Sequence, residues 1–246
     1  MAPETDLSDT VPPATDHGAT LRDIRRRLED LLAFEGRYFV VPETYAAPEE
    51  VAPAAPVVPD NGGDLETFRQ QICECLKCPL GHTRTRFVFG SGDPEAGIMF
   101  VGEAPGQEED LQGLPFVGAA GELLSKIIGA MKLSRDDVYI CNVLKCRPPN
   151  NRDPQPEEVT SCEPYLQRQI ELVRPSVICC LGRHAAHALL KTDKSLSRLR
   201  GQLHEYQGIP LVVTYHPAAL LRNAQYKRPV WDDVKWVRKM HDGTEL

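Results

Sequence analysis

The sequence lacks any long hydrophobic run. No stretch of its 246 residues approaches the roughly 18 consecutive apolar residues that cross a bilayer. The opening residues, MAPETDLSDT, are polar and acidic, without the basic region and apolar segment of a secretory signal. Hydrophobic residues make up 41% of the chain, which is ordinary for a globular protein. We therefore expect a cytoplasmic protein with a sizeable core and no membrane partner.

A disulfide framework is not indicated either, although the chain has eight cysteines. A chain of this size without an export signal is expected to keep its thiols reduced, for catalysis or for a metal. Cys179 and Cys180 lie within an apolar run, so we expect them to be small buried core residues. Cys73 and Cys141 are also predicted to be structural.

Net positive charge is missing as well, because the formal charge is −7. This value argues at first against a nucleic-acid partner. Residues 1–64, however, hold 13 acidic and 5 basic residues, whereas the rest of the chain holds 22 acidic and 23 basic ones. The acidity therefore belongs to the N-terminal part, and DNA binding by the remainder stays open.

The N-terminal part divides into two predicted segments. In residues 1–40, an acidic extension, Leu21, Ile24, Leu28 and Leu31 recur at helical spacing and predict a short amphipathic helix. Residues 41–63 are rich in Pro and Ala and have no periodicity, which predicts an extended linker. The helix is interpreted either as a docking site for a protein partner or as a solvated helix.

From residue 64 onward, apolar runs alternate with helical patterns, without an internal repeat. The runs cover 96–102, 138–144, 176–182 and 210–217, and the helical patterns cover 118–132, 156–173, 183–191 and 230–240. This alternation predicts an α/β domain with a parallel sheet covered on both faces. Ligands of such sheets bind at the carboxyl ends of the strands, where the sequence places Gly102–Gly106, Asn142 and His216.

Four other cysteines predict a metal site. Cys75 and Cys78 form a CxxC motif, and Cys146 and Cys162 lie in polar, proline-rich sequence interpreted as loop. Four such thiols complete the ligand set of a tetrahedral zinc ion or of a [4Fe–4S] cluster. Their spacing does not distinguish between the two.

Two side chains at or near the predicted strand ends suit a nucleobase, and a third suits acid–base chemistry. Asn142 is unusual inside a strand, and its amide can pair with a base edge through one donor and one acceptor. Phe116, in LPFVG, is placed to stack on a base, and His216 is the candidate for chemistry near neutral pH. The alternatives are a satisfied buried amide, a core aromatic ring and a surface histidine.

The GEAPG turn at residues 102–106 differs from a dinucleotide-binding GxGxxG motif. The acidic run QEED follows it at 107–110 and would repel a phosphate. The turn is interpreted either as a source of backbone contacts to a neutral planar ligand or as a purely structural feature.

Together these motifs closely resemble the family 4 uracil-DNA glycosylases, the iron–sulfur branch of that superfamily. The resemblance covers about three quarters of the chain and leaves out residues 1–63. It rests on the CxxC motif and on RTRFVFGSGDP, GEAPGQEED, GLPFVGAAGELL, NVLKCRPPNNRDP, Cys162, LGRHAA and HPAALLRN.

The resemblance implies a three-layer α/β/α fold with a central, mostly parallel, four-stranded sheet. It implies a monofunctional enzyme of base excision repair, expected to be monomeric, that hydrolyses the N-glycosidic bond of flipped-out deoxyuridine in single- or double-stranded DNA. The products are uracil and an abasic site. It also implies a [4Fe–4S] cluster bound by Cys75, Cys78, Cys146 and Cys162.

The implied roles of the site residues follow the same motifs. His216, Asn142 and Glu103 would be catalytic, with His216 at a uracil oxygen, Asn142 at the base edge and Phe116 stacked on the ring. The backbone of Glu103, Ala104 and Pro105 would contact uracil. Ala104 occupies the position of the water-orienting Asp of better-known uracil glycosylases, so Glu103 would assist, or the sugar cation would capture a loosely held water.

Contacts to DNA are implied on two segments. Leu220 corresponds to the wedge that fills the space of the flipped base, with a core leucine as the alternative. Phosphate contacts are expected from Arg222, Lys227 and Arg228, and from Lys145, Arg147 and Arg152, with solvated surface charge as the alternative.

Two rival functions remain at this point. A related branch traps its product covalently through a histidine in a basic loop insertion, but residues 142–162 contain neither. A cluster-carrying redox module would need a flavin or partner site, for which the acidic turn is poorly suited.

Overall fold

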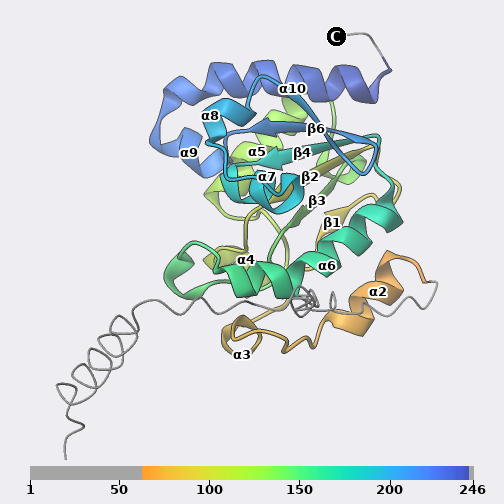
Figure 1. Ribbon diagram of the computed structural model, residues 1–246, viewed down its shortest axis with the longest axis vertical. Helices are drawn as coiled ribbons and strands as arrows, with labels where there is room; N and C mark the ends of the chain where they lie inside the picture. The colour runs from red at the N-terminus through yellow and green to blue at the C-terminus, as the bar shows by residue number, and fades with distance from the viewer. Residues whose placement is uncertain (1–62, 244–246) are drawn as a thin grey trace, which may run out of the picture. The chain divides into compact units, whose positions relative to one another are not determined.

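The computed structural model describes residues 63–243 (Figure 1). The predicted extension and, apart from Gly63, the predicted linker lie outside the described residues. Within 63–243 no helix has the length and apolar character needed to cross a membrane.

A six-stranded sheet forms the centre of the molecule, in the order β1-β3-β2-β4-β6-β5. The four inner strands are parallel: β3 (Tyr139–Asn142), β2 (Ile98–Gly102), β4 (Val177–Leu181) and β6 (Ile209–Thr214). They confirm the four predicted apolar runs and the mostly parallel sheet. The predicted count of four strands is wrong, because β1 (Ser91–Gly92) and β5 (Leu203–Tyr206) add antiparallel edges. Neither edge strand has an apolar run, since one has only two residues and the other is mostly accessible to solvent.

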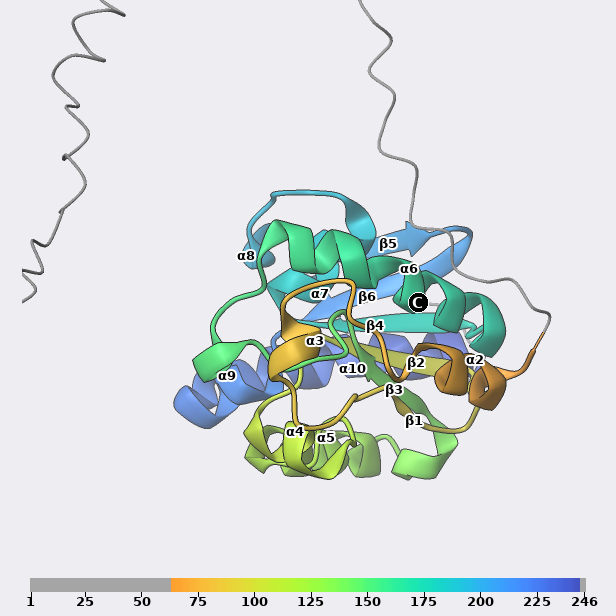
Figure 2. The ribbon, with the colours of Figure 1, turned by 90° about the horizontal axis from the view of Figure 1, so that it is seen from below.

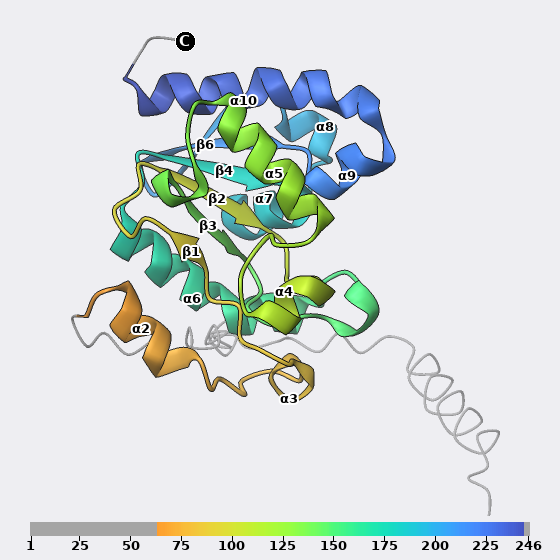
Figure 3. The ribbon, with the colours of Figure 1, turned by 180° about the vertical axis from the view of Figure 1, so that it is seen from behind.

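Helices cover both faces of this sheet, which confirms the three-layer prediction (Figure 2). One face carries α5 (Ala119–Ala130), α9 (Pro217–Arg222) and α10 (Lys227–His241). Figure 3 shows α5 in front of the sheet and α10 along the top. The other carries α2 (Leu65–Ile72), α6 (Pro156–Val173) and α7 (Arg183–Leu190). The remaining elements are short: α3 (Leu80–Thr83), α4 (Gln107–Gln112), α8 (Leu196–Leu199), η1 (Arg135–Asp137), η2 (Pro149–Asn151) and η3 (Ala224–Tyr226).

The core lies in two layers because successive strand residues point to opposite faces. In β2, Ile98 and Phe100 pack with α5 and α10, whereas Met99 and Val101 pack with α6 and α7. All of these side chains are fully buried, as are Cys179 and Cys180 in β4, which confirms the prediction for these two cysteines. A strand buried on both faces reads as a continuous apolar run, which is why the inner strands were recognisable in the sequence.

Candidate active site

A cavity of about 430 Å³ opens at the carboxyl ends of the inner strands. This is the edge at which parallel sheets bind ligands. The cavity brings together all the residues predicted to contact uracil, which are Glu103, Ala104, Pro105, Phe116, Asn142 and His216. Arg222 also lines it.

Asn142 is the last residue of β3 and pairs in register with Gly102 of β2. Its side-chain oxygen Oδ1 is buried and has no hydrogen-bond partner among the described residues. A Cβ atom on residue 102 would lie 2.3 Å from this oxygen and 2.5 Å from Cζ of Phe116, so only glycine permits the approach. An unpaired buried acceptor costs stability, which is typical of a group reserved for a ligand.

Phe116 lies in a strained turn with φ of +53°. Arg135 fixes this turn, because its guanidinium donates to the carbonyls of Pro115 at 2.7 Å and of Phe116 at 3.0 Å. The ring lies 5.5 Å from that of His216, centroid to centroid, with 33° between the planes. The phenyl group is thus held rigidly at the cavity wall.

His216 caps the N-terminus of α9, where its Nδ1 accepts a hydrogen bond from the backbone N–H of Ala218 at 3.2 Å. An accepting Nδ1 leaves the proton of the neutral ring on Nε2. Burial, and secondarily the charge of Arg222, lowers the pKa of His216 to about 4, although Glu109 opposes this shift. Near pH 7 the residue is therefore a neutral donor through Nε2.

Glu109, in the acidic run interpreted as repelling phosphate, has a structural role instead. The run forms helix α4, and the Glu109 carboxylate accepts backbone N–H bonds from Gly106 at 3.1 Å and from Val117 and Gly118 at 2.9 Å each. It ties the GEAPG turn to the turn that carries Phe116. Nothing local in the sequence distinguishes this glutamate from its solvated neighbour Glu108.

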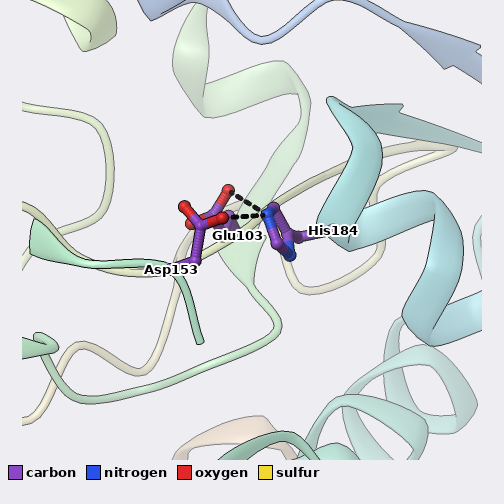
Figure 4. Close-up of side chains that lie close together, drawn as sticks. All are labelled: Glu103, Asp153 and His184. Carbon is purple, nitrogen blue, oxygen red and sulfur yellow. Dashed lines mark ion pairs between the residues drawn. The ribbon is translucent and has the colours of Figure 1, made fainter. Parts of the chain in front are cut away.

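Glu103 lies beside two residues whose role the sequence did not reveal, Asp153 and His184 (Figure 4). Nε2 of His184 is 3.8 Å from the Glu103 carboxylate and 3.4 Å from that of Asp153. Burial, and secondarily the charge of Asp153, raises the pKa of Glu103 to about 7. The three side chains have metal-ligating atoms in reach of one another, but the Arg183 guanidinium lies 3.0 Å from His184 and 3.2 Å from Asp153. A cation already balances this group, which disfavours a metal there.

The four predicted thiols converge beneath the loop that follows β3. Cys146 and Cys162 are buried, and Cys75 and Cys78 pack against the same core. Cys162 lies within α6, which begins at Pro156, so the helical pattern predicted over 156–173 is confirmed and the interpretation of Cys162 as a loop residue is wrong. Burial raises the pKa of Cys146 to about 11 and that of Cys162 to about 12.

The sulfurs are surrounded by hydrogen-bond donors. Arg84 donates to Cys146 at 3.5 Å, the Tyr165 hydroxyl to Cys75 at 3.2 Å and the backbone N–H of Lys145 to Cys162 at 3.3 Å. Such donors are typical of the surroundings of metal-bound thiolates.

Comparison with known proteins identifies the family. The model of the uracil DNA glycosylase superfamily matches residues 89–235. The chain belongs to this superfamily. A type-4 uracil-DNA glycosylase of Archaeoglobus fulgidus is 46% identical over 184 residues, which are 72% of this chain and 92% of the relative. One of Thermotoga maritima is 43% identical, covering 70% of this chain and 91% of the relative, and a type-5 enzyme of Pyrobaculum aerophilum is 34% identical over 64% and 84%.

Two residues of this glycosylase that were expected to touch DNA cannot do so as placed. Leu220 is only 3% exposed and packs in the core, so its assignment as the wedge is wrong. Lys145 is fully buried, so its assignment as a phosphate contact is also wrong. Both residues were assigned by their position in a motif. The helical phase of α9 directs Leu220 into the core, and the hydrogen-bond partners of Lys145 hold its amine inside the protein.

The other basic residues predicted to contact DNA reach the surface. Arg222, Lys227 and Arg228 are exposed around α9 and the start of α10, and Arg147 is partly exposed. Arg152 lines the cavity but also donates to the Glu158 carboxylate at 2.5 and 2.9 Å. Their contacts to phosphate stay a prediction.

Proposed function

We propose that this protein excises uracil from DNA by hydrolysing the N-glycosidic bond of a flipped-out deoxyuridine, leaving an abasic site. The observation that carries the proposal is the buried Oδ1 of Asn142, which has no hydrogen-bond partner within residues 63–243. It lies at a cavity that also holds a neutral histidine donor and a fixed aromatic ring. The bond to be broken is hidden inside a stacked duplex, so the nucleotide must leave the stack to reach the cavity.

Recognition of uracil follows from the hydrogen-bonding edges. Uracil presents N3–H between two carbonyl oxygens, so Asn142 accepts from N3–H with Oδ1 and donates to O4 with its NH₂ group. Cytosine would present a lone pair at N3 and an amino group at position 4, so both contacts with Asn142 would be repulsive. The ring of Phe116 supports the base from one face.

Bond cleavage leaves negative charge on the departing uracil and positive charge on the sugar. We assign Nε2–H of His216 to the O2 oxygen, where a fixed donor in a buried site stabilises the developing anion. The ionised Glu103 carboxylate is assigned to the sugar side, where it stabilises the cation and orients the attacking water. Ala104 has no polar side chain for this task, and the Glu109 carboxylate is committed to three backbone N–H groups.

We further propose that Cys75, Cys78, Cys146 and Cys162 bind a [4Fe–4S] cluster. Four thiols that pack against the same core and are surrounded by hydrogen-bond donors fit this group. The bound cluster would supply a cross-link between the CxxC segment, the loop after β3 and helix α6.

Cleavage of a labelled oligonucleotide with one deoxyuridine tests the activity. After incubation, alkali breaks the strand at abasic sites, and an oligonucleotide with thymine in that position is the control. A break confined to the uracil strand supports excision. An intact strand would contradict the proposal, and a protein–DNA band that resists denaturation would instead indicate the covalent trap.

A further inference from the structure

The Lys145 side chain is fully buried three residues after Asn142. Lysine is almost never fully buried unless its amine is paired. Here Nζ donates to the backbone carbonyl of Asn142 at 2.6 Å and to Oε1 of Gln169 in α6 at 2.5 Å. No carboxylate among the described residues forms an ion pair with it, so the amine is directed at one backbone carbonyl and one amide.

Gln169 anchors this amine to the rest of the core. Its own NH₂ group donates to the Phe89 carbonyl at 2.9 Å and to the Tyr139 hydroxyl at 3.0 Å. Gln169 is itself fully buried. The position of the lysine amine is therefore set by three separate parts of the chain: β3, α6 and the segment before β1.

The backbone bond after Asn142 needs such an anchor because the strand ends there. Its N–H side is held, since Val143 N–H donates to the Gly102 carbonyl at 3.0 Å. Its carbonyl belongs to Asn142, the last paired residue of β3, and the Lys145 amine donates to it at 2.6 Å. A recognition side chain must be held to within about 0.5 Å of its productive position, so fixing this peptide plane fixes the amide that reads the base.

We propose that Lys145 is a positioning residue for uracil recognition, holding the Asn142 carbonyl so that the side-chain amide faces the base edge. This inference rests on the proposed role of Asn142 as the reader of uracil.

The test compares Lys145→Met with Gln169→Leu in the full-length, iron-loaded protein. Both variants disrupt the same buried network, but only the first removes the bond to the Asn142 carbonyl. The readout is the ratio of the Kd values for free 3-methyluracil and free uracil, measured by calorimetry, because only a correctly placed Asn142 distinguishes N3–H from N3–CH₃. Thermal unfolding records the general loss of stability in each variant.

We expect a ratio of about 10 or more in the wild type and of about 2 or less in Lys145→Met. Gln169→Leu, which removes the anchor of the amine but leaves its bond to the Asn142 carbonyl, should give a ratio between these two values. A wild-type ratio retained in Lys145→Met overturns the inference, and so does an equal loss in both variants. If Lys145→Met does not fold, Lys145→Gln, which keeps a shorter donor, should show an intermediate ratio, and an unchanged one overturns the inference. A wild type that does not discriminate would instead overturn the role of Asn142.

Discussion

Glu103 and His216 border the same cavity, and burial moves their pKa values in opposite directions because it penalises the charged form of each. The pKa of Glu103 rises to about 7, and that of His216 falls to about 4. Glu103 faces Asp153, His184 and Arg183, of which Asp153 adds to the upward shift and Arg183 opposes it. At neutral pH the histidine is uncharged, while the glutamate is close to half ionised.

The single-turnover rate of uracil excision should therefore rise about tenfold between pH 6 and pH 8, because the carboxylate form of Glu103 is the active one. His216 stays neutral throughout this range and therefore does not contribute to the change of the rate with pH. Glu103→Gln should lower the rate and remove the rise. A rate that falls with pH over this range would show that protonated Glu103 is the active form.

At this scale the sequence identified residues whose type is unusual for their position. Asn142 in an apolar strand and His216 at a strand end were both recognisable, and both line the cavity. Glu109, Asp153 and Lys145 were not, because charged residues in loop-like sequence resemble solvated ones until the fold supplies their partners. In each case the role depends on partners that are brought close only by the tertiary fold.

Helix α9 shows how helical phase decides the role of neighbouring leucines. Leu220 packs inward, whereas Leu221 is 55% exposed. Counting from His216 selects Leu220 as the wedge, but of these two leucines Leu221 is the one whose side chain reaches the surface. We propose that Leu221 takes the wedge role.

Leu221→Ala should lower excision from duplex DNA more than from single strands, where no space has to be filled, with little change in stability. Leu220→Ala is the matched control and should destabilise the fold by about 2–5 kcal/mol. Single-turnover rates on both substrates and thermal unfolding measure these effects. Equal losses on duplex and single strands in Leu221→Ala would argue against the wedge.

Helix α6 carries Cys162 and, one turn later, Tyr165, whose hydroxyl donates to Cys75. Cys162→Ser should abolish stable iron binding and lower the thermal stability, because it removes one ligand of the cross-link. Cys73→Ser is the control, since Cys73 is partly exposed and its thiol donates to the backbone carbonyl of Gln70, a residue outside the proposed ligand set. Iron content per protein and the visible absorption spectrum measure the outcome. Full iron retention in Cys162→Ser would refute the ligand assignment.

For the whole molecule, the inner strands and both helical layers were predictable because two-sided burial leaves continuous apolar runs. The edge strands β1 and β5 were not, since partial exposure removes that signal. The charge distribution could also be predicted: residues 1–64 carry a formal charge of −8, and the remainder carries +1. DNA binding must then depend on a local basic patch.

Lys227 and Arg228 are exposed at the start of α10, near the cavity-lining Arg222. Replacing Lys227 or Arg228 by Gln should each weaken DNA binding and reduce the slope of log K against log salt by about 1. Lys132→Gln, an exposed change after the end of α5, should leave the slope unchanged. If the slope of log K against log salt is the same in all three variants as in the wild type, the phosphate contacts must be made by other residues.

The most direct measurement is single-turnover excision of uracil by the wild type, Asn142→Ala and His216→Ala, each with iron content and thermal unfolding matched to the wild type. Removing one donor to a developing anion costs about 100- to 1,000-fold in rate, and we expect losses of this order in both variants. Wild-type rates in both variants would contradict excision in this cavity.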